Sequence, residues 1–135
     1  YYNRSTFAGL RQQAYYNGLW NPYTIYLVGE GLRWRHFVPL AFVLSIVLLG
    51  GAGILYPPAA WLLAVELVCY GLAAAAMAAF AARRQRVSAL LVWLAFVQLH
   101  SAYGLGSLCG VLTAPLKFGI FQRRRAGAAL SDRNA

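Results

Sequence analysis

Three long apolar runs constrain the fold of this chain more than any other feature of its sequence. They cover about residues 38–56, 59–82 and 87–112, and each is close to the roughly 20 residues that cross the hydrocarbon core of a bilayer. Only 11% of the 135 residues are charged, whereas an ordinary soluble domain has about 25%. The sequence therefore predicts an all-α membrane protein with about three transmembrane helices, in a transmembrane region that covers residues 35–115.

The segment before these runs, residues 1–34, is expected to lie on the membrane surface. Ser5 or Thr6 can cap a helix that Asn17-Gly18 would end, and Pro22 is expected to keep that helix from running on. Apolar residues recur inside it at helical spacing, at Phe7, Leu10 and Ala14. This pattern predicts an interfacial amphipathic helix followed by an aromatic connector from Trp20 to Trp34. A surface helix of a missing soluble domain is the alternative.

The basic residues decide the orientation, because they bracket the apolar runs. The net charge is +9, and the cations lie before the first run, between the second and the third, and after the third: Arg4, Arg11, Arg33, Arg35; Arg83, Arg84, Arg86; Lys117, Arg123, Arg124, Arg125, Arg133. This distribution favours contact with anionic headgroups over contact with nucleic acid, and it predicts a cytoplasmic N-terminus in a bacterial inner membrane.

The basic tail, residues 116–135, is expected to be partly disordered, and it conflicts with three spans. A third crossing would place Lys117 and Arg123–Arg125 on the outer side, against the positive-inside rule. Either the segment after Gly104 turns back, or the tail is a weaker signal than the two inner loops.

Small residues predict where helices pack closely. Ala102, Gly106 and Gly110 are spaced four apart on one helical face, and the stretch from Ala73 to Ala82 is nearly all alanine. Cys69 and Cys109 differ by about 13 Å in predicted depth, which is too far for a disulfide, so both are expected to be free.

Catalytic machinery is not recognisable in this chain. Its three acids, Glu30, Glu66 and Asp132, are far apart, and no metal-ligand spacing, phosphate loop or paired carboxylate occurs, so no cofactor is expected. Glu66 is an ionisable group at membrane depth, which usually faces a partner or a cavity. Matched depth predicts an intramembrane polar cluster of Glu66, His100 and Tyr103. Its role could be structural, near a lipid substrate, or in proton transfer, and His100 could alternatively be an axial ligand to a haem or chlorophyll.

Three stretches, which follow one another in this order along the chain, are similar to those of a known family: Gln12-Gln13-Ala14-Tyr15-Tyr16-Asn17-Gly18-Leu19-Trp20, Leu32-Arg33-Trp34-Arg35-His36-Phe37-Val38-Pro39-Leu40 and Leu99-His100-Ser101-Ala102-Tyr103-Gly104-Leu105-Gly106. Together they resemble the C-terminal membrane region of bacterial family-two glycosyltransferases of the succinoglycan-biosynthesis type. In that family a cytoplasmic nucleotide-sugar-binding domain precedes an interfacial helix and the membrane helices.

The resemblance implies a membrane anchor of an enzyme that moves sugar from a nucleotide donor to a lipid-linked or polysaccharide acceptor. It places Gln13 in an acceptor-side motif, with Trp20 close by, whereas Tyr16 and Asn17 stand where the family has arginine and tryptophan. The family's Asp-x-Asp and catalytic aspartate have no counterpart here, so the partner would be an upstream catalytic domain. The alternative is a helical accessory subunit that contacts neighbouring membrane subunits and has no catalysis of its own.

Overall fold

The computed structural model describes residues 6–29 and 34–133, with side-chain surroundings for residues 6–29 and 35–119. Four α-helices and one 3-10 turn follow in the order α1 (Phe7–Val28), η1 (Trp34–Phe37), α2 (Val38–Gly53), α3 (Pro57–Gln85) and α4 (Ala89–Arg133). No strand occurs in these ranges. The all-α prediction is confirmed. Three segments are long and apolar enough to cross a membrane, namely Arg35–Gly53, Pro57–Gln85 and Ala89–Gly119, and α1 precedes them.

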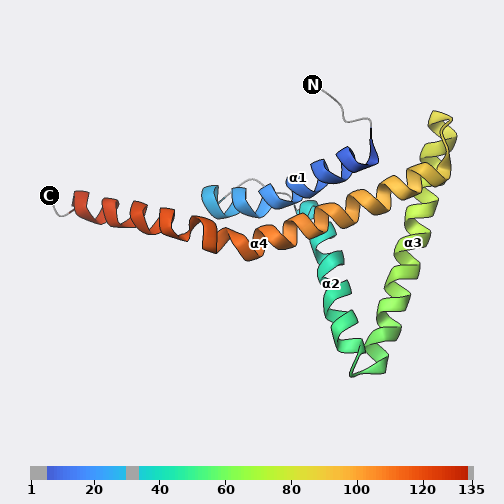
Figure 1. Ribbon diagram of the computed structural model, residues 1–135, viewed down its shortest axis with the longest axis horizontal. Helices are drawn as coiled ribbons and strands as arrows, with labels where there is room; N and C mark the ends of the chain where they lie inside the picture. Colours follow the sequence, from blue (N-terminus) through green and yellow to red (C-terminus); the bar gives the residue numbers. More distant parts are fainter. Residues whose placement is uncertain (1–5, 30–33, 134–135) are drawn as a thin grey trace.

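The helices form two parts that differ in direction (Figure 1). One is an antiparallel hairpin of α2 and α3, joined by a tight turn at Ile54–Tyr56. The other is a layer in which α1 and α4 lie side by side, with α4 running across the open end of the hairpin. We call this second part the α1–α4 layer.

The first helix begins as predicted but does not end where predicted. Thr6 caps it, since its hydroxyl accepts a hydrogen bond from the Gly9 amide at 3.1 Å. The helix then continues through Pro22 to Val28 and ends at Gly29, whose φ of 78° suits the left-handed region. The predicted end at Asn17-Gly18 was therefore wrong, and Trp20, Tyr23 and Tyr26 belong to α1 rather than to a connector.

Packing against α4 explains how α1 tolerates Pro22. A proline inside a helix leaves the carbonyl four residues earlier, here Gly18, without its usual amide donor. The buried Ser107 hydroxyl of α4 donates to the Gly18 carbonyl at 3.2 Å and supplies the missing bond. Residues 1–5 and 30–33, which hold the start of the predicted interfacial helix and part of the predicted connector, lie outside the described residues.

The other predicted boundaries shift by a few residues, except that the third long helix extends well beyond residue 112. The first span stops at Gly53, the second extends from Pro57 to Gln85, and Arg86 ends it in the left-handed region at φ 54°. α4 continues through Pro115 to Arg133, and the prediction that the tail is partly disordered stays a prediction. This extension is rich in arginine and alanine, both good helix formers.

The alanine stretch of α3 packs as predicted. Ala74, Ala78 and Ala82 recur every four residues and are all buried. Ala74 lies beside Phe96 of α4 in a shared hollow. Both cysteines are free, as predicted.

Candidate functional site

The contact between α1 and α4 is a seam of small residues, which confirms the predicted close packing at Ala102, Gly106 and Gly110. A Cβ atom added to Gly106 would overlap the Tyr15 carbonyl of α1, and one added to Gly18 would overlap the Tyr103 carbonyl of α4. A Cβ at Gly110 would come within 2.6 Å of the Leu19 carbonyl. The two backbones therefore touch directly, and side chains larger than hydrogen are excluded from these glycine positions.

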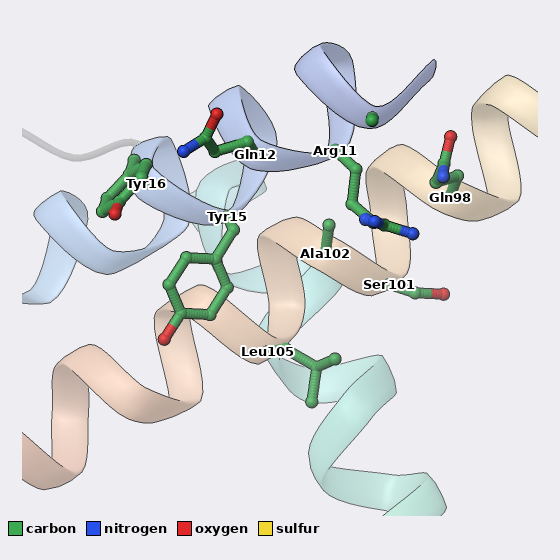
Figure 2. Close-up of a pocket in the computed structure, with 9 residues that line it drawn as sticks. Arg11, Gln12, Tyr15, Tyr16, Gln98, Ser101, Ala102 and Leu105 are labelled. Carbon is green, nitrogen blue, oxygen red and sulfur yellow. The ribbon is translucent and has the colours of Figure 1, made fainter.

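Because the seam is so narrow, longer side chains on either side of it enclose two hollows. The first, which we call the tyrosine groove, has a volume of about 640 Å³ and lies between Arg11 and Tyr15 of α1 and Gln98, Ser101 and Leu105 of α4. In Figure 2 the Arg11 side chain extends from α1 toward α4, whereas Gln12 and Tyr16 point away from α4. An exposed guanidinium at the mouth of a groove lined by amide and hydroxyl groups can bind an anion such as a phosphate.

The second hollow, the histidine groove, has a volume of about 400 Å³ and lies on the opposite side of α1. Its polar lining comes from Gln13 and Asn17 of α1 and from His100 and Tyr103 of α4, and Pro39 at the start of α2 also lines it. The lining offers both hydrogen-bond donors and acceptors without a carboxylate, so it suits a neutral polar group such as a sugar hydroxyl.

Tyr103 holds three segments together at the edge of this groove. Its hydroxyl accepts a hydrogen bond from the Asn21 amide of α1 and shares another, at 3.2 Å, with Nδ1 of His36 in η1. Ser107 and Thr113, one and three turns further along α4, bond to Gly18 and Tyr23 of α1, the latter at 2.7 Å. These bonds fix how α1 sits on α4 and thereby fix the shape of both grooves.

The site predictions for the membrane interior were only partly right. Glu66 does not pair with Tyr103 or His100; its Oε1 instead accepts a hydrogen bond from the Ser45 hydroxyl of α2 at 2.5 Å. The pairing failed because it assumed that the third run lies antiparallel to α3 over its full length, whereas α4 crosses the hairpin near its open end (Figure 1). Tyr103 is therefore turned toward α1, away from the middle of the hairpin.

His100 lies between two hollows rather than beside Glu66. It lines the histidine groove and also a more apolar hollow of about 320 Å³ bounded by Tyr70, Met77 and Phe96. Its ring centroid lies 5.8 Å from that of Tyr70, which stacks on Phe42 at 4.2 Å. His100 thus marks the point where a polar groove of the α1–α4 layer meets an apolar hollow between α3 and α4.

Of the two residues that the resemblance assigns to an acceptor-side motif, one lines a groove. Gln13 lines the histidine groove, whereas Trp20 is 57% exposed and packs edge-on against Tyr23, 5.6 Å away, outside both grooves. Sequence reasoning missed Asn21, His36 and Arg11. Asn21 lies one helical turn beyond Asn17, so a polar stripe along α1 at positions 13, 17 and 21 could have indicated it.

Two further contacts involve tyrosines of α1 and polar groups of α4. Tyr15 hydrogen-bonds to Cys109 of α4, and this bond raises the pKa of the Tyr15 phenol above its ordinary value of 10.0. Lys117 lies over the Tyr23 ring at 5.3 Å, a cation–π contact near the end of the seam. No cluster of three or more metal-ligating side chains occurs in the described part of the chain.

Comparison with protein-family models, with curated proteins and with solved structures gives no match for this chain.

Proposed function

We propose that this chain is the membrane anchor and acceptor-side region of a glycosyltransferase that moves sugar from a nucleotide donor to a lipid-linked or polysaccharide acceptor. One observation carries the proposal: the three stretches that resemble the family converge on one site. Gln13 comes from the first stretch, His36 and Pro39 from the second, and His100 and Tyr103 from the third. Residues from distant parts of the sequence thus surround a single polar groove.

In this proposal the histidine groove receives the polar head of the acceptor. Gln13 and Asn17 hydrogen-bond its sugar, and Arg11, on the other side of α1, binds a phosphate of the same or a neighbouring lipid. The apolar hollow behind His100 accommodates the start of a lipid chain. Donor binding and the chemical step belong to an upstream catalytic domain, because no carboxylate of the described residues lines either groove.

The partners in this proposal are the anionic headgroups of a bacterial inner membrane and that upstream domain, with the N-terminus of this chain in the cytoplasm and no nucleic acid involved. Basic residues at the two ends of the hairpin helices support it: Arg35 lies in η1 just before α2, and Arg83 and Arg84 lie in the last turn of α3. Arg11 lies on α1 in the adjacent layer.

The test begins with the genomic sequence upstream of Tyr1, which is expected to encode a few hundred residues of alternating strands and helices with an Asp-x-Asp. In the full-length enzyme, Gln13→Ala and Asn17→Ala should each raise the KM for acceptor several-fold without changing the KM for the nucleotide sugar. Cys69→Ala, on the exposed side of α3, is the matched control and should change neither. The isolated chain should transfer no sugar from any donor.

A second candidate, a helical accessory subunit, is favoured by the outer surface of α3. Ala73, Ala75 and Ala76 are exposed there, and small residues let another helix approach closely. A start codon within a few residues upstream, together with a neighbouring subunit that crosslinks to α3, would favour this candidate over the anchor.

A further inference from the structure

The direction of α4 does not fit a helix that crosses the bilayer parallel to the hairpin. α4 has 45 residues, so it is about 68 Å long at 1.5 Å per residue, roughly twice the hydrocarbon thickness. It meets α2 at that helix's first turns, where a Cβ on Gly104 would overlap the Pro39 carbonyl. Figure 1 shows α4 running across the open end of the hairpin, with α1 alongside. If α2 and α3 stand upright in the membrane, α4 lies close to its plane.

The positions of the basic residues also indicate that α4 lies close to the membrane plane. Arg83, Arg84 and Arg86 precede α4, and Lys117, Arg123–Arg125 and Arg133 lie in its C-terminal part. A crossing α4 would place these two basic groups on opposite sides of the membrane, and only one of them could follow the positive-inside rule. An α4 that lies in the membrane plane places both on the cytoplasmic side together with Arg11 and Arg35.

The exposed surface of α4 is suited to lipid. Leu94, Leu105 and Leu112 are 11 and 7 residues apart, three and two helical turns, so they lie on one face. They are 44%, 49% and 64% exposed, while the seam residues Gly106 and Gly110 on another face are buried against α1. We call these three residues the leucine stripe. An apolar stripe on a helix with basic residues at its ends is typical of helices at the acyl–headgroup boundary.

We propose that the α1–α4 layer rests on the cytoplasmic leaflet, with the leucine stripe in the acyl boundary, and that only the α2–α3 hairpin crosses the hydrocarbon core. The partner of this surface is the lipid leaflet itself: its acyl chains contact the stripe, and its anionic headgroups contact the basic residues at both ends of α4. This arrangement holds whether or not the chain belongs to a glycosyltransferase.

The depth of spin labels along α4 tests this proposal. The full chain is reconstituted in vesicles of phosphatidylethanolamine and phosphatidylglycerol, and every native cysteine is replaced except where Cys69 itself carries the label. Single labels are placed at Leu94→Cys, Leu105→Cys and Leu112→Cys. Depth is measured from relaxation by oxygen against relaxation by a water-soluble nickel complex. The matched control series is Leu62→Cys, the native Cys69 and Ala76→Cys, three exposed positions on α3 that are two turns apart.

The two series should differ clearly. The labels on α4 are expected to lie at one depth within about one helical turn, or roughly 5 Å, near the headgroups. The control labels are expected to pass through the membrane centre, with Cys69 deepest. Depths at Leu94 and Leu112 that differ by about 27 Å, the length of roughly 18 helical residues, would overturn the proposal. So would a leucine stripe as deep as Cys69.

Discussion

The α1–α4 layer and the α2–α3 hairpin are built from similar residues but are held together differently. In the layer, backbones touch at Gly18 and Gly106, and side-chain hydrogen bonds from Ser107, Tyr103 and Tyr23 join the two helices. In the hairpin, a hydrogen bond from Ser45 to Glu66 joins side chains of α2 and α3, and most large side chains of the described residues face outward. At the turn, Ile54 and Leu55 are 83% and 89% exposed.

This difference indicates that the hairpin and the α1–α4 layer are adapted to different surroundings. Lipid is as apolar as leucine, so an exposed leucine on the hairpin costs nothing in a bilayer, and the hairpin is stable there with few internal contacts. In the arrangement proposed above, the layer lies at the membrane surface, where water and headgroups compete for every hydrogen bond. Its geometry is accordingly fixed by backbone contact and by specific polar pairs. The comparison predicts that mutations in the layer have larger effects than similar mutations in the hairpin.

The largest effect is expected at the seam. Gly106→Ala places a methyl group against the Tyr15 carbonyl, and the two backbones must separate along their contact. Overpacking of this kind costs about 1–3 kcal/mol or more, and both grooves should open. The readout is thermal unfolding in detergent, together with the rate of proteolysis within α1. A change of less than about 0.5 kcal/mol would mean that the seam is not tightly packed.

Gly51→Ala is the control for this comparison. Gly51 lies in α2, and a methyl group added there would have no described atom of another segment within 4 Å, so the substitution meets open space. Alanine is the better helix former by about 1 kcal/mol, and the variant should therefore be unchanged or slightly more stable.

A smaller effect is expected from two matched tyrosines. Tyr103→Phe removes the hydroxyl that bonds Asn21 and His36, and at about 1 kcal/mol for each lost hydrogen bond it should cost about 1–2 kcal/mol. The Tyr70 hydroxyl is buried in the hairpin and has no hydrogen-bond partner among the described residues, so Tyr70→Phe should be neutral or stabilising. Unfolding of the two variants, measured side by side, checks this. Equal losses would contradict the difference between the two regions.

The smallest effect is expected at Glu66. Glu66→Gln keeps an acceptor for the Ser45 hydroxyl, and Oε2 has no described partner to lose. Interhelical hydrogen bonds in membranes contribute about 0.6 kcal/mol on average. A double-mutant cycle with Ser45→Ala and Glu66→Leu should therefore give a coupling of about this size, with Glu66→Gln close to wild type. A coupling of several kcal/mol would mean that Glu66 is part of a larger polar network.

The sequence was sufficient for the elements that depend on local pattern. Composition and a period of about four residues were enough to predict the apolar runs, the alanines of α3, the Thr6 cap and the spacing of Ala102, Gly106 and Gly110. What the sequence could not provide was the direction in which α4 leaves α3, because Arg86-Val87-Ser88 is compatible with several crossing angles. The partner of Glu66 was predicted wrongly because the crossing angle between α3 and α4 was not known from the sequence.

The prediction of where α1 ends was wrong for a related reason. Asn17-Gly18 and Pro22 are local signals for a helix end, and tertiary contact with Ser107 overrides them. The site was predictable in part: Gln13, His100 and Tyr103 were identified, but Asn21, His36 and Arg11 join them only through the packing of α1 on α4. Hydrogen-bond partners across helices depend on register, which single-sequence patterns do not specify.

The sides on which the two ends of α4 lie test the central claim, that the hairpin crosses the membrane while the α1–α4 layer does not. Single cysteines are placed before α4 at Ser88→Cys, near its end at Ser131→Cys, and at the hairpin turn at Leu55→Cys. An impermeant thiol reagent is then applied to intact and to permeabilised cells. We predict that Ser88→Cys and Ser131→Cys are both protected until the cells are permeabilised, whereas Leu55→Cys is labelled in intact cells. Labelling of Ser131→Cys in intact cells, with Ser88→Cys protected, would show that α4 crosses the bilayer and would contradict the account.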